Sequence, residues 1–235
     1  GADLLDFYVE SGFKWAQMCV AERNFDEAVK MYGELLTKNL PEERWCTVAM
    51  EEAGLLIQLA EDIVVADPKK DKAKLDKRNG YIEQATKLVD KLLWKNELII
   101  VFGKAIAMKA HIEMLRGNVE KAQSLVTDYM PQLAEIHNSL RSQDPDGSKG
   151  YVRMSPMPEC RYLLAKMLWA AAQAESKAAK PDEEKIKAAL LGARVNGKRN
   201  GLGAFNHAVN VFIQYPESSS SMDAGQVYEE IAAFV

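Results

Sequence analysis

The sequence predicts an all-α protein, and three observations support this prediction. Apolar residues recur in steps of three and four along almost the whole chain, which is the period of an α-helix. Strand signals are nearly missing, because no Asn-Gly turn lies between runs of alternating β-branched residues. In addition, one arrangement of alanine between two bulky apolar residues returns four times. We expect one domain over residues 1–235.

Periodicity and helix-stop signals together predict ten helices. Their expected ranges are 3–22, 25–39, 42–65, 72–95, 97–116, 119–142, 157–178, 182–196, 202–215 and 221–234. Pro41 cannot continue the helix that precedes it, and Gly117-Asn118 suits a short turn that admits positive φ. The stretch 142–159 is rich in proline and glycine, so we expect no helix there. Loops of this length are often functional or mobile, and we expect it to be the most protease-sensitive internal segment.

Composition excludes several classes of protein. Hydrophobic residues make up 48% of the chain and charged residues 27%, which fits a soluble protein with a buried core. The net charge of −4 argues against a general nucleic-acid binder, and no apolar run is long enough to span a bilayer. The chain begins with Gly1, which we interpret as a tag remnant or a processed end. Cytoplasmic and exported locations therefore both stay open.

Cysteine and histidine spacing predicts neither a disulfide framework nor a metal site. The three cysteines are far apart and form no CxxC, so we expect small buried core residues: Cys19, Cys46 and Cys160. Each histidine stands alone and no HExxH occurs; the three are His111, His137 and His207. His111-Ile-Glu113 lacks the PCxxC that would complete a zinc deaminase motif. We assign no catalytic, cofactor-binding or metal-binding residue.

The recurring arrangement places alanine three residues after one bulky apolar residue and four before the next. The four copies are Phe25-Ala28-Tyr32, Ile82-Ala85-Val89, Val119-Ala122-Val126 and Phe205-Ala208-Phe212. These steps put all three residues on one helical face. The small central alanine lets a neighbouring helix approach closely, and the bulky residues fill the gaps on either side. Such helix pairs expose more apolar surface than they bury alone, so they stack.

Residues 12–41 resemble one unit of the tetratricopeptide repeat (TPR) family. Ala16 matches the small residue of the family's first helix, Ala28 the small residue of the second, and Tyr32 the following aromatic position. Pro41 closes the unit about one residue late. Residues 105–133 are similar to a second unit, in which small residues match at Ala110, Gly117 and Ala122. The segment 205–218 resembles the second helix and exit turn of bacterial TPR-like proteins.

This resemblance implies a right-handed α-α superhelix of about five hairpins that binds a protein or a peptide. The first helices of such hairpins line the concave face, so Phe13, Gln17, Lys104 and His111 are candidate partner-binding residues. The lysine and asparagine clamp that some family members use for a C-terminal carboxylate is missing. Phe13 and Gln17 hold its positions in the first unit, and Ala107 and His111 lie near them in the later unit.

The segment "GARVNGKRNGLGAF" (192–205) is rich in glycine and basic residues. It lacks the third glycine of a dinucleotide fingerprint, and a helix rather than a strand precedes it. We interpret it as a turn between two helices. Arg194, Lys198 and Arg199 are candidate contacts for an acidic partner, but we expect loss of Lys198 and Arg199 to change stability little.

The function that we expect is non-covalent binding of a protein or peptide, without a cofactor. Two alternatives stay open: an exported TPR-like subunit of a bacterial envelope assembly or uptake machine, suggested by Tyr215-Pro216-x-Ser218, and a helical enzyme with an unrecognised pocket. A homo-oligomer is compatible with the sequence. We expect the tryptophans in the core, with at most one in a binding groove; they are Trp15, Trp45, Trp94 and Trp169.

Overall fold

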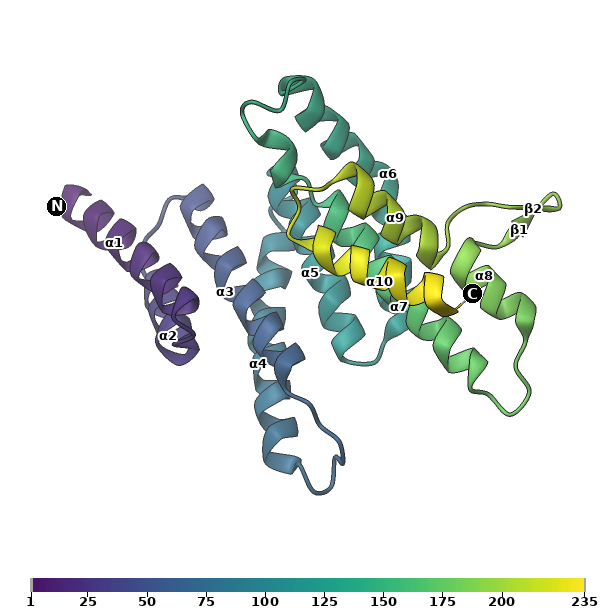
Figure 1. Ribbon diagram of the computed structural model, residues 1–235. Coiled ribbons are helices and arrows are strands. Elements are labelled where there is room, and N and C mark those ends of the chain that lie inside the picture. The colour runs from purple at the N-terminus through teal and green to yellow at the C-terminus, as the bar shows by residue number, and fades with distance from the viewer. Residues whose placement is uncertain (1, 235) are drawn as a thin grey trace. The chain divides into compact units, whose positions relative to one another are not determined.

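The computed structural model describes residues 2–234, with side chains from Leu4 onward, and confirms an all-α fold (Figure 1). The helices of the described chain are α1 (Ala2–Ala21), α2 (Phe25–Leu36), α3 (Glu42–Asp62), α4 (Lys72–Leu93), α5 (Ile99–Leu115), α6 (Val119–Gln143), α7 (Met157–Ser176), α8 (Glu183–Leu191), α9 (Ala204–Gln214) and α10 (Ser220–Phe234). A 3₁₀ turn, η1 (Tyr151–Met154), precedes α7. Two short strands, β1 (Arg194–Val195) and β2 (Lys198–Arg199), pair antiparallel between α8 and α9.

Helix boundaries follow from backbone chemistry. Pro41 precedes α3 with a φ of −54°, which its ring imposes. Gly117 adopts a φ of 82° between α5 and α6, a conformation that costs glycine little. Asp182 caps α8, because its side chain accepts hydrogen bonds from the backbone N–H groups of Glu184 and Lys185.

The described chain divides into two compact units, Gly1–Arg116 and Gly117–Val235. In the first unit consecutive helices pack on each other from α1 to α5, and α3 also packs on α5. In the second unit α7 packs on α6, α8, α9 and α10. Each unit has an apolar core of its own.

The four repeat alanines are completely buried, as the close-packing argument requires. They are Ala28, Ala85, Ala122 and Ala208. Their bulky neighbours are less uniform: Tyr32 and Val89 are buried, whereas Phe212 is 49% exposed. The alanine is therefore the constant part of the arrangement, because only a small side chain fits where two helix backbones approach closely.

One acidic side chain lies inside the first unit. Glu52 of α3 is 7% exposed, and its Oε1 lies 3.8 Å from where a Cβ at Gly33 of α2 would be. Burial raises the pKa of Glu52 to about 7, because the apolar surroundings disfavour the charged form. A carboxyl group with this pKa is half-protonated near neutral pH.

We predict that Glu52 makes the folded protein less stable as the pH rises from about 4.5 through 7. The folded state holds the proton more tightly than the unfolded state, so the stabilisation is complete below pH 4.5 and lost above 7. Glu52→Gln should remove this dependence and stabilise the protein at pH 8 by up to about 3 kcal/mol.

Urea unfolding between pH 5 and 8 measures this effect. Glu51→Gln is the matched control, since Glu51 is adjacent but exposed. An unchanged pH slope in Glu52→Gln would contradict the prediction.

Candidate functional site

A pocket of about 700 Å³ lies in the second unit, between the long loop after α6 and the turn from α9 to α10. The two features that the sequence singled out, 142–159 and Tyr215-Pro216-x-Ser218, therefore lie together. The charged and aromatic lining residues are His137, Arg141, Asp144, Asp146, Arg153, Tyr215 and Glu217. The pocket thus offers both charge signs and an aromatic wall.

Asp144 holds the loop together from within. Its side chain is buried, its Oδ1 accepts a hydrogen bond from Lys149 N at 3.1 Å, and its Oδ2 accepts one from Tyr151 N at 3.0 Å. Arg153 Nε donates to Glu217 Oε2 at 2.6 Å and so joins the loop to the α9–α10 turn. Both partners of that ion pair are mainly exposed, so solvent weakens it.

An edge-to-face pair of rings forms the inner wall. His137 and Tyr215 have ring centroids 5.1 Å apart at 76°, and His137 Nδ1 lies 3.1 Å from Ser155 Oγ. Burial lowers the pKa of His137, and the positive charges of Arg141 and Arg161 lower it further. Both effects favour the neutral imidazole, which can form hydrogen bonds without adding charge to the wall.

Arg161 of α7 lies near several of these groups. Its charge also depresses the pKa of His207, which burial, the larger cause, lowers to about 4. Arg161 also lowers the pKa of Tyr215, although burial outweighs it and the net shift is upward. Among the described side chains, Arg161 Nε and His207 Nδ1 are buried without a hydrogen-bond partner. The positive charge of Arg161 therefore acts on His137, His207 and Tyr215 alike.

Arg141 is an exposed basic residue in the lining of the pocket. It lies on the last turn of α6, and in the described part of the chain its guanidinium takes part in no ion pair. Arg153, by contrast, is already paired with Glu217. Arg141 is thus the lining cation that is available to a carboxylate from another molecule.

The predicted groove residues of the first unit lie on two helices. Phe13 of α1 packs edge-on against Tyr32 at 5.9 Å, so it belongs to the core, and Gln17 is exposed. Lys104 of α5 is half-buried, and His111 Nε2 lies 3.1 Å from Glu61 Oε2. The α1 and α5 residues belong to helices that contribute to separate apolar clusters.

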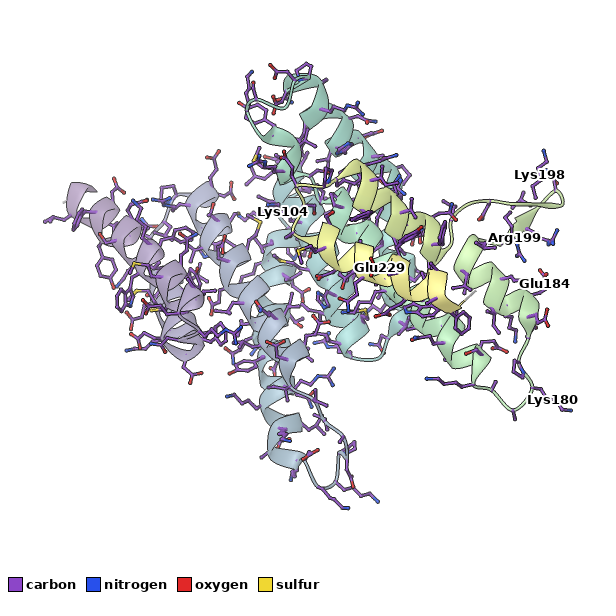
Figure 2. All side chains as sticks on the ribbon, viewed as in Figure 1. Lys104, Lys180, Glu184, Lys198, Arg199 and Glu229 are labelled. Carbon is purple, nitrogen blue, oxygen red and sulfur yellow. The ribbon has the colours of Figure 1, made fainter. Side chains whose placement is uncertain are left out.

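The predicted basic contacts of the second unit form the strands β1 and β2. Arg199 Nη1 donates to Gly192 O at 3.2 Å, and its Nη2 donates to Glu184 Oε2 at 3.0 Å. Arg194 Nε lies 3.6 Å from the same Glu184 oxygen. Figure 2 shows Lys198 at the outer end of this hairpin, and Lys198 is exposed. Two of these three basic side chains, Arg194 and Arg199, are therefore already paired with groups of the same chain.

The expectation that a helix continues to residue 196 was wrong, because α8 ends at Leu191. Gly192 has a φ of 92°, and a Cβ there would collide with Asn200 Oδ1. Asn196 and Gly197 then adopt φ values of 52° and 80°. Two successive residues with positive φ are typical of the two-residue hairpin that Asn-Gly favours. The sequence therefore did contain a hairpin signal, although the strands are only two residues long.

The expectation that the tryptophans are buried holds for only some of them. Trp169 is 6% exposed and donates from Nε1 to Glu230 Oε2 at 2.9 Å. Trp15 is 46% exposed and Trp94 is 85% exposed. A second hollow, of about 320 Å³, is lined by Trp45 and Trp94 with Lys91 and Lys95. The three cysteines are buried, as predicted.

Two further observations concern the described residues only. No three of their histidine, cysteine or acidic side chains are grouped as metal ligands would be. None of their helices is both long enough and apolar enough to cross a bilayer. Comparisons with protein-family models, with curated proteins and with solved structures gave no match.

We predict that Asp144→Ala loosens the loop, because two partly buried backbone N–H groups, of Lys149 and Tyr151, would lose their acceptor. The expected loss is about 1–3 kcal/mol of stability, with faster proteolysis between residues 145 and 150. Asp128→Ala is the control, since Asp128 is an exposed carboxylate on α6, outside the loop. Limited proteolysis with mass mapping measures the effect. Equal cleavage rates for both variants would show that Asp144 does not hold the loop.

We also predict that Arg199→Ala lowers stability by about 1–2 kcal/mol, because the hydrogen bonds to Gly192 and Glu184 are lost. Lys198→Ala should stay within about 0.5 kcal/mol. This differs from the sequence-based expectation, which gave both residues little effect. Thermal melts of the two single variants decide between the structure-based and the sequence-based expectation. Identical melting temperatures would refute a structural role for Arg199.

Proposed function

We propose that this chain is a non-catalytic protein- or peptide-binding scaffold, built from stacked TPR-like helical hairpins. The buried repeat alanines and the sequential packing of α1 to α5 support the stacking. The observation that carries the binding role is the pocket beside the long loop, where the Arg141 guanidinium is unpaired while its neighbours are already engaged.

The chemistry of this pocket fits a short peptide segment that carries a carboxylate. Arg141 can bind that group in two parallel hydrogen bonds. Pro145, Val152, Pro158 and Pro216 supply apolar contact, and the Tyr215 ring supplies a flat surface. Asp144 fixes the loop by local hydrogen bonds, so little conformational entropy would be lost when the ligand binds.

The enzyme alternative rests on the His137 and Ser155 pair, whose Nδ1 and Oγ lie 3.1 Å apart. Ser155 is buried, and its Oγ accepts a hydrogen bond from Met157 N at the start of α7. This hydroxyl is therefore engaged at a helix start, which favours binding over nucleophilic catalysis. The envelope-subunit alternative keeps the same pocket, because Tyr215, Pro216 and Ser218 line it.

We predict that Arg141→Glu removes a partner that the unaltered chain captures from its native cell. Charge reversal would place like charges at the point where a carboxylate binds, and the affinity of the purified partner should fall about tenfold or more. Lys180→Glu is the matched control: Lys180 is exposed in the loop between α7 and α8 and forms no ion pair among the described residues (Figure 2).

The test is affinity capture with mass spectrometry on the three chains, followed by calorimetry with the purified partner. A partner kept by Lys180→Glu and lost by Arg141→Glu is the expected result. A third variant, Lys198→Glu, tests the hairpin as the acidic-partner contact. Identical partners for the unaltered chain and Arg141→Glu would remove the pocket from the proposal.

A further inference from the structure

Helix α1 presents a second apolar face that does not pack on α2. This face comprises five exposed residues, here called the α1 stripe: Leu4, Phe7, Ser11, Trp15 and Met18. The exposed fractions are 75% for Leu4, 71% for Phe7, 46% for Trp15 and 53% for Met18. Four large apolar side chains along one helix face form the kind of exposed patch that marks a contact surface.

The core-facing side of α1 is formed by other residues. Val9, Ala16 and Cys19 are buried in the cluster that α1 shares with α2, and Phe13 packs against it. Because successive residues turn by about 100° around a helix, the α1 stripe points well away from this side. The α1 stripe is therefore a surface separate from the core-facing side of α1.

The spacing of the α1 stripe is palindromic. Its residues follow one another in steps of three, four, four and three, with Ser11 at the centre. If two copies of α1 lie antiparallel with Ser11 on a two-fold axis, Leu4 of one copy meets Met18 of the other, and Phe7 meets Trp15. A small polar residue at the centre lets the two helices approach closely. A two-fold interface needs this kind of self-complementary surface.

The charges beside the stripe fit the same arrangement. Glu10 and Lys14 lie on one edge of it; within one copy their Oε1 and Nζ are 3.5 Å apart, and Glu10 Oε2 also accepts a hydrogen bond from Arg44 of α3. A two-fold axis perpendicular to both helices places the edge of one copy that carries Glu10 and Lys14 beside the same edge of the other copy. Lys14 of one copy then lies within two residues of Glu10 of the other, so opposite charges face each other across the interface. Such flanking pairs favour one orientation of two packed helices.

We propose that the α1 stripe is a self-association surface, through which two copies of this chain form an antiparallel α1–α1 dimer. This proposal is independent of the pocket in the second unit. Covering the exposed parts of these side chains would bury about 1,000 Å² in total, near the lower end for specific interfaces. The dimer is therefore weak and depends on concentration.

A cysteine at the two-fold axis tests the geometry directly. Facing helices with axes about 10 Å apart bring the two Cα atoms at the axis to about 5 Å, which a disulfide can bridge. Ser11→Cys should therefore form a disulfide-linked dimer under mild oxidation. Gln17→Cys is the control: Gln17 is also exposed, but its two copies would lie about 18 Å apart along the helices. The native cysteines are buried and should not compete.

Sedimentation velocity over a series from about 1 µM to about 1 mM measures the association itself. Trp15→Glu should weaken it about tenfold or more, since a central aromatic residue is replaced by a charge. Gln17→Glu should leave it unchanged. Cross-linking of Ser11→Cys but not Gln17→Cys, with association lost in Trp15→Glu, supports the proposal. A monomer throughout the series, equal cross-linking of the two cysteine variants, or a dimer that tolerates Trp15→Glu would each overturn it.

Discussion

Close contact between helices at buried alanines is the constraint on which this structure depends. Ala28, Ala85, Ala122 and Ala208 have no exposed surface, although they come from helices in both units. A methyl side chain lets two helix backbones approach, and a larger one would displace a whole helix rather than one side chain. The apolar residues one turn away then fill the space beside the contact. Because this contact recurs along the chain, each core is built mainly from neighbouring helices.

The second unit adds polar groups to this packing. Asp144 is buried because its carboxylate replaces the hydrogen bonds that the loop backbone would otherwise make with water. His207 Nδ1 and Arg161 Nε lie inside without such partners, and burial lowers the pKa of His207 to about 4. The long loop thus stays close to α6 and to the α9–α10 turn, which gives the pocket its shape. Arg141, which lines the pocket, is exposed, and no carboxylate of the described chain pairs with it.

The two candidate contact surfaces differ in their chemistry. The pocket in the second unit is polar and mixed in charge, which suits a ligand that supplies hydrogen bonds and a carboxylate. The α1 stripe in the first unit is apolar and nearly symmetric, which suits a surface like itself. The two proposals therefore assign self-association to the first unit and binding of a different molecule to the second.

The sequence by itself determined the helices of this protein and the residues that bring them together. The three-and-four period, the prolines and Gly117 placed most helix ends within a few residues, because these signals act on the local backbone. It did not reveal the β1–β2 hairpin, since two-residue strands carry no period and only Asn196-Gly197 marks the turn.

The sequence marked the long loop and the Tyr215 turn as separate features. It gave no signal that His137 and Arg141, two residues of a regular helix, line the same pocket. Only the tertiary structure decided that the loop and the turn form one pocket, because their contact joins residues about 60 positions apart. It also decided which large rings are buried. Trp15 and Trp169 both lie on regular helices, but only Trp169 has helices packed around it, and packing rather than local propensity determines burial.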